Sequence, residues 1–273
     1  MMKQIIVGID FSNSSLVALR LAIDIANRTG ADILMLWVQT KEMDKDEAEQ
    51  KLILLAKENE GNLNGKNISY IISQGKVYQA MSNLSKLENP DLIVIGAHGK
   101  GGYDEKYAGQ NAFKVVTESN IPVLIVRENF NFNKNLEKIV LPIDSTKDTR
   151  QKVPWTIEFA KMFPHSQVNI LGVQTSTIPD IRHDVVSYVL SVDNFLTQHN
   201  VAHTEHYVNS RNITDSTIEY AKEINADLIV ITTEQEKTLN NLFFLGPYAQ
   251  QMINLSPFPV LVVPIKQLHG AAK

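Results

Sequence analysis

Cysteine is absent from the 273-residue chain. Its absence excludes a disulfide scaffold, a thiolate zinc site, an iron–sulfur cluster and a cysteine nucleophile, and it fits a reducing compartment. Long hydrophobic runs are missing as well, because runs such as residues 92–97 fall far short of the roughly 20 residues that a membrane-spanning helix needs. The first residues lead into a strand-like run instead of the apolar core of a signal peptide. We therefore expect a cytoplasmic protein that does not enter a membrane.

An excess of positive charge is also lacking. The chain has 26 lysines and arginines against 30 aspartates and glutamates, and the two signs are interspersed. Proteins that bind nucleic acids usually concentrate positive charge on one surface, so we expect no nucleic-acid partner. The hydrophobic share of 44% is that of a globular protein with one large core or two small ones.

A tandem repeat divides the chain into halves. Three segments recur at offsets of 134 to 137 residues: 6–10 as 140–144, 89–95 as 225–231, and 121–126 as 258–263. An asparagine-rich stretch near residues 129–135 separates the copies. The sequence therefore predicts two related domains, residues 1–130 and 136–273, each of an ordinary domain size.

Short β-branched runs alternate with segments of helical period in the first half. The predicted strands are 4–9, 32–38, 68–73, 92–96 and 123–126. Because residues 92–95 are all apolar, they suit a strand covered on both faces, which is typical of parallel sheets. The alternation predicts βαβ crossovers and an α/β fold with a doubly wound, five-stranded parallel sheet in each half.

Helical stripes lie between these strands. The first runs from Leu16 to Ala26, with N-cap oxygens at residues 12–14 and a stop at Gly30. A later stripe comprises Val77, Met81, Leu84 and Leu87. Both patterns predict helices that pack one apolar face against the sheet.

Ligands of open parallel sheets bind beyond the carboxyl ends of the strands, near a reversal of strand order. Asp10 follows the first predicted strand and Val38 ends the second. Five glycines follow the fourth strand within fourteen residues, at positions 96, 99, 101, 102 and 109. Closely spaced glycines let backbone amides converge on an anion, and a helix that begins near residues 109–111 adds its N-terminal amides and dipole. We interpret this segment as a phosphate site.

Two common phosphate motifs do not match. A Walker A loop needs Ser or Thr after its lysine, but Gly101 follows Lys100, and a Rossmann fingerprint needs glycine where Asp104 stands. The spacing that fits is Gly-x2-Gly-x9-Gly, between an Asp-Leu-Ile-Val strand at 91–94 and the Pro-Val-Leu run at 122–124. In this order the motifs resemble the universal stress protein family, twice over nearly the whole chain, in its tandem two-domain form.

The resemblance implies an adenine-nucleotide α-hydrolase-like fold and a site for ATP, ADP or AMP, with Mg²⁺, in the first domain. The implied site comprises Ile9, Asp10, Val38, Ile95, Gly96, His98, Gly99, Gly109, Gln110 and Asn111. In it, Asp10 contacts the nucleoside, the Val38 backbone reads the adenine edge, and the glycines admit the phosphates. One departure stands out, because Gln110 replaces the Ser or Thr that follows the third glycine in ATP-binding members.

The second half has lost the glycine segment. Thr232 and Gln235 replace Gly96 and Gly99, while Gly246 persists with Pro247 behind it. Acidic residues at 234 and 236 add negative charge where a phosphate needs donors. We expect this domain to bind no nucleotide and to serve packing or protein partners. Because the two halves are fused, we expect either a monomer in which the two domains pair within one chain, or a homodimer.

The leading hypothesis is a stress-response regulator that binds a nucleotide and hydrolyses ATP slowly at most. The alternatives are a nucleotide-independent adaptor and an ATP-using enzyme. Asp10 has a second interpretation as a local cap, and His98 as a solvated loop residue. His203 and His206 face opposite sides of a strand, which disfavours a shared metal. Trp37 and Trp155 are expected to be packing residues.

Overall fold

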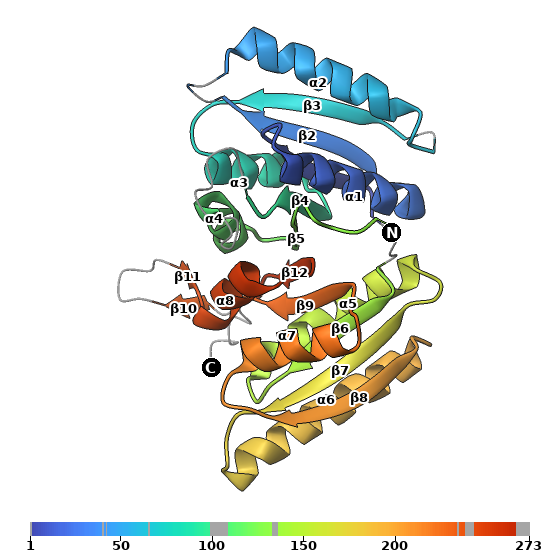
Figure 1. Ribbon diagram of the computed structural model, residues 1–273, viewed down its shortest axis with the longest axis vertical. Coiled ribbons are helices and arrows are strands. Elements are labelled where there is room, and N and C mark those ends of the chain that lie inside the picture. Colours follow the sequence, from blue (N-terminus) through green and yellow to red (C-terminus); the bar gives the residue numbers. More distant parts are fainter. Residues whose placement is uncertain are drawn as a thin grey trace, which may run out of the picture.

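The computed structural model describes residues 2–39, 41, 43–64, 66–98, 109–132, 136–233, 235–237 and 243–265. Ten strands form one continuous sheet in the order β3-β2-β1-β4-β5-β12-β9-β6-β7-β8 (Figure 1). The first half supplies β1 (Gln4–Ile9), β2 (Asp32–Val38), β3 (Ile68–Ser73), β4 (Leu92–Gly96) and β5 (Val123–Val126). The second half supplies β6 (Lys138–Ile143), β7 (Gln167–Gln174), β8 (His203–Asn209), β9 (Leu228–Thr232) and β12 (Val260–Val263).

Within each half the five strands are parallel and doubly wound, as predicted. The structure adds a join between the halves, because β12 pairs with β5 in antiparallel orientation and sets Leu261 opposite Leu124. Every residue of both strands is buried. Strands that are apolar on both faces need a hydrogen-bonded neighbour on each side, and each half provides that neighbour for the other.

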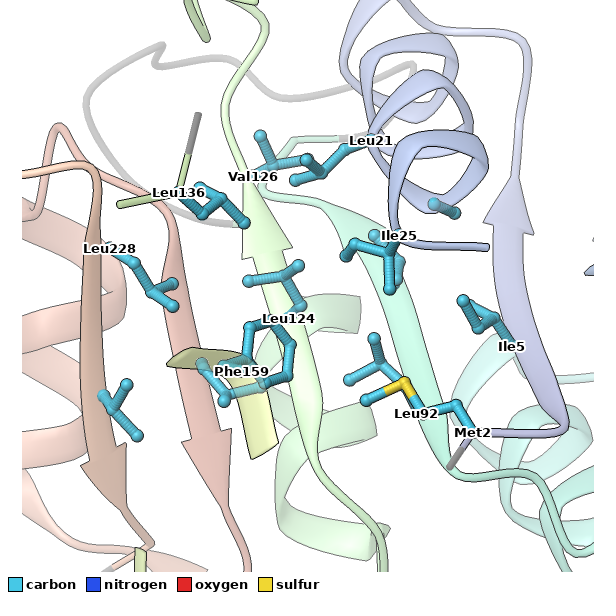
Figure 2. Packing of buried hydrophobic residues seen from close by; sticks show 14 of the residues in the cluster. Met2, Ile5, Leu21, Ile25, Leu92, Leu124, Val126, Leu136, Phe159 and Leu228 are labelled. Atoms are coloured by element: carbon cyan, nitrogen blue, oxygen red, sulfur yellow. The ribbon is translucent and has the colours of Figure 1, made fainter. Parts of the chain in front are cut away.

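Helices cover both faces of the sheet. One face carries α1 (Asn13–Thr29), α2 (Lys45–Glu60), α5 (Val153–Met162) and α6 (Pro179–Gln198), and the other carries α3 (Val77–Glu88), α4 (Gln110–Glu118), α7 (Ile213–Glu223) and α8 (Pro247–Leu255). Each of the two cores extends across both halves. Figure 2 shows the join in one of them, where Leu124 of β5 lies among Phe159 of α5 and Leu228 of β9.

The caps of α1 lie where the sequence predicts them. Ser12 is the N-cap and its side chain accepts a hydrogen bond from the Ser15 amide. Gly30 ends the helix in the left-handed conformation, with φ of 75°, and its amide donates to the Ala26 carbonyl. A side chain would be strained at this φ, which is why glycine stops the helix here.

The apolar face predicted for α3 is wrong at its last residue, Leu87. Met81 and Leu84 are buried, but Leu87 is 81% exposed. At 100° per residue, Leu87 falls at the margin of the face centred on Ala80, Met81 and Leu84, and it lies in the last turn.

Among the helices described, none is long and apolar enough to cross a bilayer.

Candidate functional site

The carboxyl ends of β1 and β4 lie side by side where the strand order reverses. β1 pairs with β2 on one side and with β4 on the other, and the chain winds outward from this point in both directions. The structure therefore brings Ile9, Asp10, Val38, Ile95, Gly96 and His98 to one edge of the sheet. This edge is the place where open α/β sheets bind ligands.

Asp10 forms the turn that leads from β1 into α1. Its Oδ1 accepts hydrogen bonds from the Ser12 amide at 3.0 Å and from the Ser12 hydroxyl at 2.5 Å. Asp144 repeats this turn after β6, because its Oδ1 accepts from the Thr146 amide at 2.7 Å and from the Thr146 hydroxyl at 2.5 Å. Since the turn occurs in both halves, the local interpretation of Asp10 is supported independently of any ligand.

Gly96 is required by packing. A Cβ at Gly96 would lie 2.4 Å from Ser14 Oγ and 2.7 Å from the Ser14 carbonyl carbon. The Ser14 hydroxyl also donates to the carbonyl of His98, which fastens the first turn of α1 to the end of β4. In the second half Thr232 takes the place of Gly96, and the 3₁₀ helix η1 (Lys147–Lys152) contacts β9 there instead of an α-helical turn. The sequence indicated Ser14 only as a cap.

The helix after the glycine segment begins where the sequence predicts it. Gly109 is the N-cap of α4, and its amide donates to the Ala97 carbonyl at 2.7 Å. Among the described residues no side chain caps this helix, and its first turn holds no acidic residue. Gln110 and Asn111 are exposed. The amides of a first turn have no acceptor within the helix and lie at the positive end of its dipole, so they suit an anion. Gly99 lies outside the described residues.

The second half diverges immediately after β9. The Thr233 amide donates to the Val263 carbonyl at 3.0 Å, as the Ala97 amide donates to Val126 at 2.8 Å in the first half. Strands β10 (Gln235–Lys237) and β11 (Phe243–Leu245) then form an antiparallel pair in place of the glycine segment. α8 starts at Pro247, which has no amide hydrogen. The second half therefore offers one donor fewer at its helix N-terminus.

Arg127 belongs to none of the sequence motifs, yet it joins the two halves beside this edge. It follows β5 directly, and its guanidinium donates to the carbonyls of Asn254 at 2.5 Å, Ser256 at 2.8 Å and Ile253 at 3.2 Å. Its Nη1 lies 3.5 Å from Nε2 of His98. Burial lowers the pKa of Arg127 from its ordinary value. The one signal in the sequence is that Pro264 stands at the corresponding position of the repeat.

The two histidines of β8 have different partners. His203 Nε2 lies 2.7 Å from Asp193 Oδ1, and its Nδ1 lies 2.7 Å from the Val201 carbonyl. The ring of His206 stacks on Tyr220 instead. Within the described ranges, no three His, Asp or Glu side chains are grouped to hold a metal ion.

The tryptophans pack as predicted. Trp37 is buried in a core, and Trp155 lies half-buried against the same core.

Two cavities lie away from the carboxyl ends of the strands. One, of about 650 Å³, is bounded by α1, α2, Phe130, Phe132 and Leu136, and the other, of about 380 Å³, lies between α3 and α4 near the start of β4.

Comparison with known proteins places the chain in a family. The profile of the universal stress protein family matches residues 1–127 and 135–264, so the chain belongs to this family. A universal stress protein of Mycolicibacterium smegmatis is 28% identical over 138 residues, and the alignment spans 45% of this chain and 45% of that protein. The chain therefore matches less than half the length of that relative.

Solved structures match over nearly the full length. A universal stress protein from Archaeoglobus fulgidus superimposes with a TM-score of 0.76 at 19% identity, covering 96% of this chain and 98% of that one. A putative universal stress protein from Pseudomonas aeruginosa gives 0.71 at 14% identity, covering 97% and 94%. At these identities the likeness shows the fold, which is that of two universal stress protein domains in one chain.

Proposed function

We propose that the first half binds ATP or a related adenine nucleotide, and that the protein acts as a stress-response regulator. The observation that carries this proposal is the start of α4. Gly109 gives α4 no side-chain cap, its first turn holds no acidic residue, and in the sequence the helix follows a glycine-rich segment and β4, which lies at the reversal of strand order. Backbone amides at a helix N-terminus are a common phosphate site in α/β folds.

The other residues at this edge fit the same ligand. Asp10 and the backbone of Val38 end neighbouring strands, as an adenosine bound across β1 and β2 requires. The amides of Gln110 and Asn111 would face the phosphates. Mg²⁺ would be held largely by phosphate oxygens and water, as is usual for this ion. The second half supports the contrast, because Pro247 and the pair β10–β11 stand in place of these features.

Binding is better supported than turnover. Asp10 and His98 are titratable residues at this edge, and the side chains of both already have partners: the Asp10 carboxylate accepts from Ser12, and Nε2 of His98 faces the Arg127 guanidinium. A general base needs its lone pair free to accept a proton from the attacking water. We therefore expect at most slow hydrolysis of ATP.

The test begins with the purified full-length protein. Mass spectrometry of the ligand released on unfolding, with calorimetry of ATP, ADP and AMP, should reveal an adenine nucleotide. The Gly109→Val variant should lose binding because a branched side chain at the N-cap obstructs the approach to the first-turn amides. Gly246→Val is the matched control, because Gly246 is the N-cap of α8 and has a similar backbone conformation. No released nucleotide and no heat at millimolar ligand would favour the adaptor.

A further inference from the structure

We infer that Arg127 is a positioning residue that makes the second half a part of the nucleotide site in the first. It joins His98, which leads into the glycine segment, to the C-terminus of α8 in the other half. This inference rests on the proposed function, and it names how that site is coupled to the rest of the chain.

The antiparallel join explains why Arg127 reaches α8. Ile125 of β5 pairs with Val260 of β12, so the carboxyl end of β5 lies beside the segment that enters β12. That segment is the end of α8, which has no basic residue in its own last turn. Arg127 supplies the cation and the donors that a helix C-terminus favours, and it does so from the other half.

Arg127 links the first half to α8 of the second half, and the repeat has no equivalent arginine that would link the second half to the first. Pro264 stands where the repeat would place a second arginine, and proline has no side-chain donor. The half that keeps the glycine segment therefore has this link, and the half that lost the segment lacks the counterpart residue. Arg127 therefore occurs in the half that keeps the glycine segment, and this agrees with a role at the site as well as at the join.

Arg127 and α1 hold His98 from two sides. Ser14 Oγ donates to the His98 carbonyl, and the guanidinium faces Nε2 at 3.5 Å, the long limit for a hydrogen bond. A guanidinium has donors and no acceptor, so a hydrogen bond at this contact requires Nε2 to be the acceptor. A neutral His98 ring that accepts through Nε2 carries its proton on Nδ1.

A second contact reaches the other end of that segment. β11 lies beside α4, although it belongs to the other half (Figure 1). The chain that replaced the glycine segment in the second half thus adjoins the helix that follows it in the first. Both ends of the nucleotide segment are in contact with the second half, through Arg127 at His98 and through β11 at α4.

Coupling of this kind is reciprocal. A nucleotide that orders His98 and α4 will also stabilise the end of α8, and loosening α8 will weaken the nucleotide. The second half then reports occupancy of the first, without a nucleotide of its own. A protein partner that binds near α8 would sense this change.

Three variants of the full chain test the inference. Arg127→Ala should weaken ATP binding in the presence of Mg²⁺ by about tenfold, and Arg127→Lys should recover part of it, because lysine keeps the charge and loses the planar fork. Arg150→Ala is the control, since that guanidinium packs over Tyr188 within the second half. It should bind ATP within about twofold of the wild type, which is the scatter expected of a distant site.

Hydrogen exchange provides a readout that packing alone would not move. ATP should slow exchange of amides 248–256 in the wild type and in Arg150→Ala, and leave it unchanged in Arg127→Ala. Nitrogen-15 NMR of the ligand-free protein should show His98 protonated on Nδ1, and on Nε2 in Arg127→Ala.

The outcomes separate the two claims. Binding of ATP to the wild type with unchanged affinity and exchange in Arg127→Ala overturns the inference and leaves the proposed function in place. If the wild type binds no nucleotide, the proposed function fails and the inference fails with it. If Arg127→Ala does not fold, Arg127→Lys decides, and wild-type affinity with wild-type exchange in that variant counts against the inference.

Discussion

Ser14 occupies the space that a side chain on Gly96 would need. A Cβ there would lie 2.7 Å from the Ser14 carbonyl carbon, and a backbone atom in the first turn of a helix cannot move aside cheaply. A glycine that a motif assigns to phosphate thus has a packing requirement of its own. A phosphate role predicts that a substitution at Gly96 weakens nucleotide binding, whereas the packing requirement predicts that it lowers the stability of the fold.

Gly96→Ala should lower the free energy of unfolding by about 1–3 kcal/mol, the usual cost of overpacking a rigid contact. Urea unfolding measures it. Gly61→Ala is the matched control, because its Cβ would meet nothing within 4 Å and its φ is −69°. That variant should be neutral or more stable by a few tenths of a kcal/mol. Equal effects at the two positions would contradict the packing account.

Asp91 and Asp227 fasten the first strand of their halves. Oδ2 of Asp91 accepts from the amides of Lys3 at 2.5 Å and Gln4 at 3.2 Å, and Asp227 does the same for Glu137 and Lys138. Asp91→Ala should destabilise the protein by about 1.5–3 kcal/mol, because two amides lose a charged acceptor.

Asp24→Ala is the control for Asp91→Ala. Asp24 forms a surface pair with Arg28 at 3.3 Å. Its loss should cost less than about 0.5 kcal/mol, since such exposed helical pairs contribute little. If Asp24→Ala destabilises the protein as much as Asp91→Ala, the strand-fastening role is wrong.

Gln110→Ser should tighten ATP binding by about tenfold, the worth of one hydrogen bond to a charged group. The serine hydroxyl is shorter and restores the residue that ATP-binding members of the family carry. AMP, which lacks the terminal phosphates, should bind both forms equally. Calorimetry of the two nucleotides gives the comparison, and a parallel gain for AMP would show that Gln110 does not face the terminal phosphates.

Alkaline pH should weaken the fold through Tyr220. Burial, and then the charge of Glu223, raise the pKa of Tyr220 above its ordinary value of 10.0. Because the folded state holds the proton more tightly, this contribution is complete below pH 10.0 and is lost as pH rises through the folded pKa. Tyr220→Phe should therefore show a shallower loss of stability above pH 10.0 in urea titrations, and an unchanged slope would refute this assignment.

The first half was predictable where its signals are local. Its five strands have the predicted bounds, and Ser12 and Gly30 cap α1, because apolar runs and cap chemistry are read from neighbouring residues. The pairing of β5 with β12 was not predictable, since either edge of an apolar strand can accept a neighbour. The domain limits at 130 and 136 stay a prediction.

The candidate site was predictable in outline only. Asp10, Val38 and Gly96 share one strand-end edge, as the rule for parallel sheets requires. The role of Ser14 depends on how closely α1 approaches β4, and that of Arg127 depends on a strand of the other half. Neither of these tertiary contacts can be predicted from a local sequence pattern.

The most direct test counts the nucleotides bound per chain. We predict that calorimetric titration of the full-length protein with ATP and Mg²⁺ gives one site per chain, which Gly109→Val removes and Gly246→Val leaves in place. A stoichiometry of zero would contradict the account of the first half. A stoichiometry of two would contradict the account of the second.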